Sequence, residues 1–407
     1  KKQKFITFFT PLDKPLVIFL LVTLFSLLRS FFLKHPHFVQ SNLYDGLYRE
    51  LLYSILSEGS KNYLFLFVNW FLVYYAAIYF LEKKEFLIRV IRLSYLTAGI
   101  ASIYGILQYF GIELIWPKVI NPFGGRCVST FGNPNFLSPF LILTLLLTFG
   151  EYLSNEKKSL RIFYLCLNLL LFFALLCTLT RSSWGGLLAG LVFLLCILWR
   201  YEKGFVQKNK SWLISILFFL VVFAIFFPRS KVGYGPTVIE RLTELGQARE
   251  TAYGPLHQRF LIWSCAWDMF KEQPLLGKGW GTFELFYPFY QGKYLYLEKF
   301  KSFRTHANNA HNEIFEITSQ TGIIGLGVFL WLWISFYYWA FTLFKLPFDI
   351  KEKIFVFTLA AGITGMLVDN ILNVSLHFAI PAFFFFWCLG IFTNLGIQRE
   401  KNVCKNI

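Results

Sequence analysis

Three arginines lie in polar, glycine-containing segments that stand beside long apolar runs. Arg126 follows two glycines within residues 121–135. Arg181 lies among hydroxyl residues at 178–186, and Arg259 lies in an amphipathic stretch that precedes a glycine-rich loop. A guanidinium group stays ionised and binds phosphate oxygens through two hydrogen bonds at once. The three arginines therefore predict an oxyanion site, such as one for phosphate. The alternative is that each arginine extends to lipid headgroups at a membrane edge.

His311 lies in the polar residues 304–316, just before a long apolar run. An imidazole accepts a proton near neutral pH, so this side chain predicts a general base that acts on a hydroxyl group. A structural histidine is the alternative. His306 is five residues away, which differs from the four-residue spacing of a zinc-binding helix, so we predict no metal.

Asp369 closes another apolar run, together with Asn370. An acid at the end of a membrane span predicts a partner for His311 or for one of the arginines. The alternative, which the sequence favours, is that Asp369 simply caps the span.

The composition requires that these residues be positioned by membrane-spanning helices. The chain has 407 residues, of which 56% are hydrophobic and only 15% are charged. A soluble domain has about 25% charged residues, and runs of 18 or more apolar residues are typical of membrane spans. These numbers exclude a soluble enzyme, a disordered chain and a coiled coil. The net charge of +16 is attributed to membrane topology rather than to a nucleic-acid partner.

We predict an all-α polytopic membrane protein with ten apolar spans. The spans cover residues 15–33, 63–81, 86–110, 136–153, 160–180, 183–200, 211–228, 319–344, 353–370 and 374–395. A long connection at 229–318 holds amphipathic helices, which divides the chain into an N-terminal transmembrane bundle (1–228), this extracytoplasmic loop (229–318) and C-terminal transmembrane helices with a cytoplasmic tail (319–407).

The distribution of basic residues predicts the orientation. With the N-terminus in the cytoplasm, the inside segments carry twenty Lys and Arg residues and the short outside segments carry six. The positive-inside rule therefore predicts that both termini are cytoplasmic and that the loop 229–318 faces outward. In this orientation the three arginines and His311 all lie on the extracytoplasmic face.

Arginines and a base on one membrane face predict transfer from a lipid-linked phosphate donor. The sequence contains no GxxxxGK[ST] motif, so nucleoside triphosphates are not the predicted energy source. A different class, a polysaccharide or lipid exporter, would place polar residues through the spans. A non-catalytic scaffold would tolerate the loss of His311.

The segment after His311 resembles a known signature. His311 and Asn312 are followed after nine residues by Gly322, and after two more by Gly325. This pattern is similar to the signature H-[NSQ]-x9-G-x-x-G of the bacterial O-antigen ligase superfamily. That superfamily also includes certain O-antigen polymerases and protein O-oligosaccharyltransferases, and the signature favours the ligases.

Three further segments, those around Arg126, Arg181 and Arg259, extend the resemblance over roughly residues 60–395. It implies a C-type glycosyltransferase-like membrane fold with about 10–12 transmembrane helices. It further implies a glycan donor on undecaprenyl pyrophosphate, a lipid A–core acceptor, inverting transfer without metal or cofactor, and a periplasmic active site in the bacterial inner membrane.

The resemblance also implies residue roles. The three arginines resemble pyrophosphate ligands, His311 resembles the base that activates the acceptor, and Asn312 and Asp369 are supporting residues. An apolar groove is needed for the polyprenyl tail, and the aromatic-rich residues 329–344 are one source of it. The alternative for this stripe is an ordinary helix core.

Overall fold

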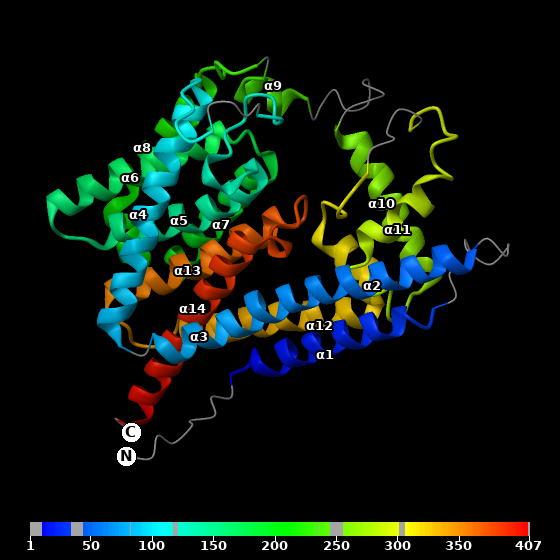
Figure 1. Ribbon diagram of the computed structural model, residues 1–407. Coiled ribbons are helices and arrows are strands. Elements are labelled where there is room, and N and C mark those ends of the chain that lie inside the picture. The colour runs from blue at the N-terminus through cyan, green and yellow to red at the C-terminus, as the bar shows by residue number, and fades with distance from the viewer. Residues whose placement is uncertain are drawn as a thin grey trace. The chain divides into compact units, whose positions relative to one another are not determined.

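The computed structural model describes residues 10–33, 44–81, 83–116, 121–233, 235–244, 255–300 and 306–405. Within these ranges the regular structure is helical and contains no strand (Figure 1). This confirms the predicted fold class, a polytopic helical membrane protein.

A helix forms at each of the ten predicted spans. Seven stretches within the described part of the chain are long and apolar enough to cross a membrane, and they are Arg49–Phe80, Glu85–Tyr109, Pro134–Ser154, Lys158–Cys177, Arg181–Tyr201, Glu313–Leu343 and Ala379–Lys401. The helices α1 (Asp13–Ser30) and α13 (Ile350–Asp369) carry more charged residues, and α8 (Lys203–Ile225) is only partly described. Whether these three also cross the membrane stays a prediction.

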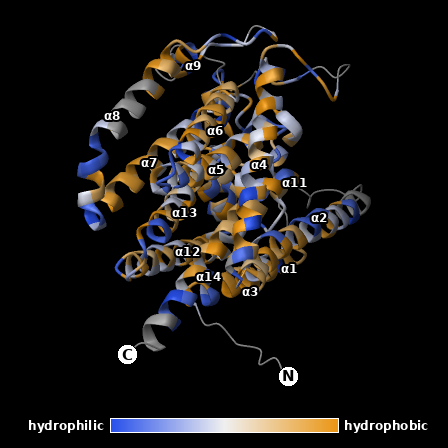
Figure 2. Cartoon of the chain, turned by 90° about the vertical axis from the view of Figure 1, so that its left-hand side faces the viewer, coloured by the Kyte–Doolittle hydropathy of each residue, from blue (hydrophilic) through white to orange (hydrophobic). Residues whose placement is uncertain are grey.

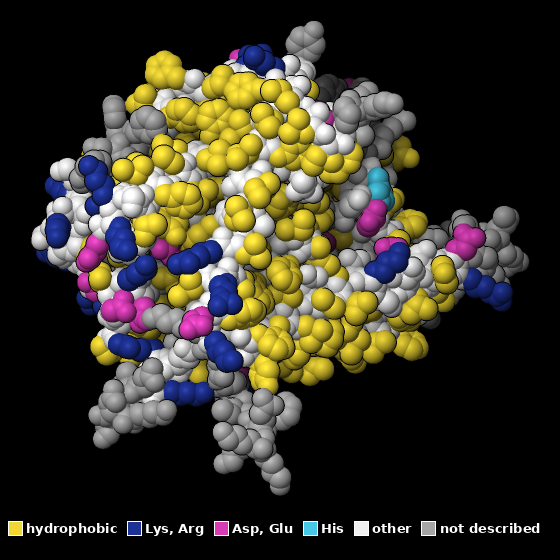
Figure 3. All heavy atoms as spheres, turned by 60° about the vertical axis from the view of Figure 1, so that its left-hand side comes forward, with side chains coloured by type: hydrophobic (Ala, Val, Ile, Leu, Met, Phe, Trp, Pro, Cys, Tyr) yellow, Lys and Arg dark blue, Asp and Glu magenta, His cyan; other side chains and the backbone are white. Residues whose placement is uncertain are grey.

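Hydrophobic residues predominate along many of these helices (Figure 2), and apolar side chains cover much of the face that Figure 3 shows, as expected where lipid is the solvent. Helix α4 (Lys84–Tyr109) is an example, since Leu93, Leu96, Ile100 and Ile103 are all more than half exposed. Their spacing places them on one face of the helix. Water would penalise such a stripe, whereas hydrocarbon does not.

The chain forms two compact units, which are described separately. The first comprises residues 1–72, 253–343 and 400–407, and the second comprises residues 73–252 and 344–399. The division of the chain at residues 228 and 318 stays a prediction.

The first unit is built around a cluster of aromatic rings. Its elements are α1, α2 (Tyr44–Leu66), η2 (Phe67–Leu72), α10 (Pro255–Glu272), α11 (Phe283–Gln291) and α12 (Glu313–Leu343). The ring of Phe19 on α1 lies 5.4 Å from Trp70 and 5.9 Å from each of Trp280 and Phe329. These contacts join α1 to α12 and to the loop before α11.

Helix α10 was predicted as an amphipathic helix on the membrane surface. The helix is present, and Leu261, Cys265 and Met269 are buried on the side that packs against α11 and α12. Its apolar face therefore packs largely against protein, while Phe260 and Trp267 remain exposed.

The second unit is a helical bundle with α13 in contact with α5 and α7. Its elements are α3 (Val73–Phe80), α4, η3 (Ser129–Phe131), α5 (Pro134–Ser154), α6 (Lys158–Cys177), α7 (Arg181–Tyr201), α8, α9 (Val238–Thr243), α13, η5 (Ser375–His377) and most of α14 (Ala379–Lys405). A Cβ atom at Gly186 would lie 2.5 Å from the Gly365 carbonyl oxygen, and one at Gly190 would lie 2.9 Å from the Ala361 carbonyl oxygen. The small residues at 186 and 190 thus allow α7 to approach α13 closely.

Candidate functional site

Arg126 is held at the turn between α6 and α7. Its Nε donates a hydrogen bond to the Thr178 carbonyl oxygen at 2.7 Å. Its Nη2 donates to Asn135 Oδ1 and to Thr180 Oγ1, each at 2.8 Å. The guanidinium therefore joins its own loop to the start of α5 and to the turn that precedes Arg181.

The glycines before Arg126 explain how its loop reaches this position. Gly124 and Gly125 have φ values of +61° and +80°, which favour glycine. A Cβ atom at Gly125 would lie 2.0 Å from the Val232 carbonyl oxygen. The loop therefore packs directly on the segment that leads from α8 to α9.

Arg181 is the first residue of α7, and its guanidinium lies in a polar cluster. Its Nη1 donates to the Arg241 carbonyl oxygen at 3.1 Å and lies 3.4 Å from Glu244 Oε2. Leu179, two residues earlier, has φ +49°, an unfavourable conformation for a residue with a side chain. Since Arg126 binds Thr178 and Thr180, two of the three arginines predicted from sequence, Arg126 and Arg181, meet at one turn.

A third arginine at this turn was missed by the sequence analysis. Arg241 on α9 donates from Nε to the Leu179 carbonyl oxygen at 3.4 Å, and its Nη1 lies 2.7 Å from Glu244 Oε2. The sequence feature that could have drawn attention to this segment is the capping box that Thr237 and Glu240 form at the start of α9. That motif predicts a helix but not where the helix docks.

Asp369 is fully buried at the end of α13 and supports the first turn of α7. Ser183 Oγ donates to Asp369 Oδ1 at 2.7 Å, and Asn373 Nδ2 donates to Asp369 Oδ2 at 3.0 Å. Because Ser183 follows Arg181 by two residues, Asp369 helps to position the start of the helix that carries Arg181. A role of Asp369 toward His311, which belongs to the other unit, stays a prediction.

In the first unit, His311 lies between a tight polar turn and the start of α12. Its φ is +50°, and its backbone N–H donates to Asn309 Oδ1 at 3.1 Å. Such a left-handed residue costs conformational energy and is a frequent feature of functional sites. The next residue, Asn312, caps α12, since its Oδ1 accepts hydrogen bonds from the backbone N–H groups of Ile314 and Phe315 at 2.9 and 3.1 Å.

Helix α10 brings Arg259 to His311. Trp263 Nε1 donates to the Ala310 carbonyl oxygen at 2.9 Å, and its ring stacks on Phe315 with centroids 5.7 Å apart. Arg259 is one turn before Trp263 and so lies on the same face of α10. Burial, and then the positive charge of Arg259, lower the pKa of His311 from 6.5 to about 4. The imidazole is therefore neutral at pH 7 and can accept a proton.

Gly322, the first of the two signature glycines after His311, forms a break in α12. Gly322 has φ +66° and ψ −163°, and a Cβ atom there would lie 2.3 Å from the Leu275 carbonyl carbon. The break leaves backbone groups of α12 without partners in the helix, and residues 274–279 bind them. Ile323 N–H donates to the Pro274 carbonyl oxygen at 2.8 Å. In the other direction, Lys278 N–H donates to the Ser319 carbonyl oxygen at 2.9 Å. The glycine-rich loop thus serves to bind the broken helix.

The aromatic residues at 329–344 are partly buried and partly exposed, so the expected groove for a lipid tail stays a prediction for this stripe. Phe329, Phe336 and Phe344 are buried, two of them completely. Phe329 and Phe336 both have Trp333 as a ring neighbour within α12. The alternative, a helix core, applies to these buried rings, whereas Tyr338 of the same stripe is exposed.

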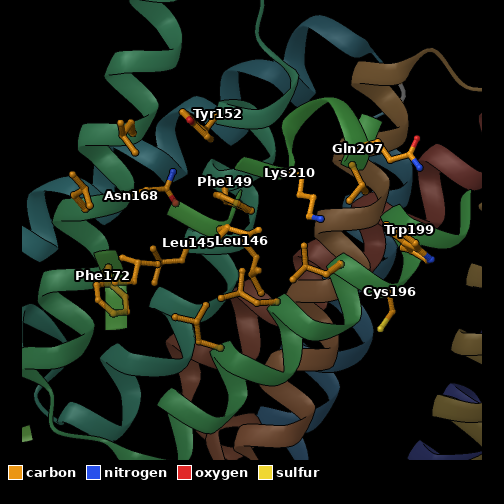
Figure 4. Close-up of a pocket in the computed structure, with 18 residues that line it drawn as sticks. Leu145, Leu146, Phe149, Tyr152, Asn168, Phe172, Cys196, Trp199, Gln207 and Lys210 are labelled. Atoms are coloured by element: carbon orange, nitrogen blue, oxygen red, sulfur yellow. The ribbon is translucent and has the colours of Figure 1, made fainter. Parts of the chain in front are cut away.

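The second unit contains a different apolar cavity, of about 630 Å³, lined by residues of α5, α6, α7 and α8 (Figure 4). Leu187, Leu191 and Leu195 form one of its walls along α7, and Gln207 and Lys210 lie at its polar part. Among the described residues, no group of three or more His, Cys, Asp or Glu side chains could hold a metal ion.

Fold and site together define a multi-pass helical membrane protein with an arginine cluster in one unit and an arginine–histidine pair in the other. A family model described as O-antigen ligase matches residues 166–330, which include Arg181, Arg259 and His311, whereas Arg126 lies before the match. A general O-oligosaccharyltransferase of Acinetobacter baylyi (strain ATCC 33305 / BD413 / ADP1) is 24% identical over 346 residues, which cover 77% of this chain. The chain spans 56% of the length of that protein. Both comparisons support the resemblance to the O-antigen ligase superfamily.

Proposed function

We propose that this protein is a glycosyltransferase of the O-antigen ligase type. It transfers a glycan from undecaprenyl pyrophosphate to a hydroxyl group of lipid A–core on the periplasmic face of the bacterial inner membrane. The observation that carries the proposal is the neutral, half-buried His311 beside Arg259, in a chain that also gathers Arg126 and Arg181 at one turn.

The reaction is a single displacement at the anomeric carbon of the donor sugar. The acceptor oxygen forms a bond to that carbon, and the bond between the carbon and the pyrophosphate oxygen breaks. His311 takes the proton of the acceptor hydroxyl. The arginines bind the pyrophosphate, whose charge grows as it leaves, and each stabilises that charge by on the order of a few kcal/mol in a partly dry site. In this way they supply the charge that a divalent metal supplies in other transferases.

The apolar cavity of the second unit suits the polyprenyl tail. Leu187, the first of its wall residues on α7, lies six residues after Arg181, or about 9 Å along the helix axis. A lipid whose pyrophosphate binds at Arg181 can therefore extend its tail down the same helix into this cavity. The groove expected at 329–344 is not needed.

A second candidate is a protein O-oligosaccharyltransferase, which the name of the Acinetobacter relative favours. The donor chemistry would be the same and only the acceptor would differ. Purified protein given one lipid-linked glycan together with lipid A–core, an acceptor protein or a second lipid-linked glycan distinguishes ligase, protein transferase and polymerase by the labelled product.

The central experiment separates the roles of the histidine and the arginines. His311→Ala should lower the transfer rate by about 10²–10⁴, the typical loss of a general base, and leave donor binding unchanged. Arg126→Lys keeps the charge but loses the planar group that binds at two points, so donor binding should weaken. Transfer is measured with purified protein, and donor binding by thermophoresis.

Two variants serve as matched controls. His306→Ala removes an exposed histidine five residues from His311, and Arg229→Lys changes an exposed arginine that pairs with Glu240. Both should transfer glycan at the wild-type rate. A His311→Ala protein with wild-type activity would contradict the mechanism.

A further inference from the structure

Arg241 stands out because it shares the environment of the two arginines assigned to the pyrophosphate. Its Nε approaches the Leu179 carbonyl oxygen within the α6–α7 turn, and its own carbonyl oxygen accepts a hydrogen bond from Arg181. Its guanidinium is largely buried, with 19% of the side chain exposed, close to the 18% of Arg181. The arginines at this turn therefore come from three separate segments of the chain.

Among the described residues, Glu244 is an ion-pair partner shared by two arginines at this turn. Arg181 and Arg241 both approach a single oxygen, Glu244 Oε2, at 3.4 and 2.7 Å. These two guanidinium groups thus share one carboxylate oxygen at this turn. A carboxylate presents a planar pair of oxygens with one negative charge, which resembles part of a phosphate group. A pyrophosphate brings more oxygens and more charge, so it competes effectively for the same donors.

The position of α9 is set by packing and not by the Arg241–Glu244 contact alone. A Cβ atom at Gly235 would lie 2.3 Å from the Gly124 carbonyl oxygen, so the segment before α9 packs on the Arg126 loop. The Thr237–Glu240 capping box then fixes the start of the helix. Glu244 follows the last helical residue and can move away while Arg241 stays in place.

We propose that Arg241 is a third pyrophosphate-binding arginine, and that Glu244 is an internal anion which holds Arg181 and Arg241 until the lipid pyrophosphate displaces it. The proposal rests on the proposed function, because it assumes that Arg126 and Arg181 bind the donor. It adds Arg241 as a residue that binds the pyrophosphate. It also adds Glu244 as an internal group that competes with the pyrophosphate, so removing the Glu244 charge should strengthen donor binding.

The test measures binding of undecaprenyl pyrophosphate itself to purified full-length protein in nanodiscs. Arg241→Gln should raise Kd about tenfold or more, because a charged hydrogen bond to phosphate is lost. Glu244→Gln should lower Kd several-fold, because the competing charge is removed. Arg229→Gln is the matched control, since it removes the same charge from an exposed ion pair of the same segment and should leave Kd unchanged.

The outcomes distinguish this inference from the proposed function. If Arg181→Gln binds the lipid as the wild type does, the pyrophosphate site itself is wrong. If Arg181→Gln weakens binding but Arg241→Gln does not, only the role of Arg241 fails. A Kd that rises or stays constant in Glu244→Gln overturns the displacement. An unfolded protein cannot bind the lipid more tightly, so a lower Kd in Glu244→Gln supports the proposal independently of folding. If Arg241→Gln does not fold, Arg241→Lys tests the role of Arg241.

Discussion

At the scale of single residues, His311 is kept neutral by its surroundings. Burial disfavours the imidazolium ion, and the nearby Arg259 adds repulsion, so the pKa falls to about 4. A base with a low pKa is weak but remains available at acidic pH. In the proposed mechanism an anionic donor bound at Arg259 would relieve this repulsion and raise the basicity of His311.

This predicts an unusual pH dependence. Because the pKa is lowered, the base form is populated at all pH values above about 4. The value of kcat/KM, measured at low donor concentration, should therefore stay nearly constant between pH 7.5 and 5.5. A histidine with the ordinary pKa of about 6.5 would lose roughly 90% of its base form over this range.

Arg259→Gln provides the internal comparison for the pH profile. Removing the charge of Arg259 should raise the pH at which kcat/KM falls on the acidic side of the profile. The pKa of His311 should not return fully to 6.5, because burial is the larger cause of its decrease. A steep loss of kcat/KM in the wild type near pH 6.5, with the same profile in Arg259→Gln, would show that His311 is not in this environment.

At the scale of elements, the break in α12 connects the segment after His311 to the glycine-rich loop. The broken helix and residues 274–279 supply each other's backbone hydrogen bonds, so neither has the observed conformation without the other. Ser26 on α1 adds to this junction by donating to the Gln320 carbonyl oxygen at 2.7 Å. The start of α12, where Asn312 is the cap, is thereby anchored to α1 and to the end of α10.

Gly322→Ala should therefore be costly. The alanine would have to adopt φ +66° and would meet the Leu275 backbone, and strained conformations of this kind cost about 1–3 kcal/mol each. We expect a lower midpoint of thermal unfolding in detergent together with reduced transfer. Gly327→Ala is the control on the same helix, since a Cβ atom there would have no neighbour within 4 Å. Equal midpoints for the two variants would contradict this account of the break.

At the scale of the whole molecule, the proposed chemistry depends on which side of the membrane carries the arginine cluster. The excess of basic residues in the predicted inside loops favours the periplasmic side for Arg126, Arg181 and α9. The segment that joins α7 to α8 then faces the cytoplasm.

Labelling with a membrane-impermeant maleimide tests this topology. A cysteine introduced by Thr243→Cys, an exposed position on α9, should react in intact spheroplasts. A cysteine introduced by Gln207→Cys, an exposed position near the start of α8, should react only after permeabilisation. The unmodified protein gives the background from its own cysteines. The reverse pattern would place the arginines in the cytoplasm and remove the periplasmic reaction.

The sequence by itself determined the helical membrane architecture and the four residues on which the proposed function rests. Apolar runs of span length form helices because hydrocarbon offers the backbone no hydrogen-bond partners, so this part of the fold follows from local composition. Arginine and histidine stand out in the sequence because the apolar runs beside them contain few charged residues.

Only the tertiary structure decided which further residues lie beside the arginines predicted from the sequence. Arg241 and Glu244 reach the α6–α7 turn through contacts with residues about 60 positions away in the sequence, and the capping box that precedes them carries no information about where α9 docks. The aromatic residues at 329–344 were open to two interpretations, because burial against lipid and burial against protein require the same apolar side chains. Hydropathy specifies that a side chain avoids water, but packing between distant segments determines what it contacts instead.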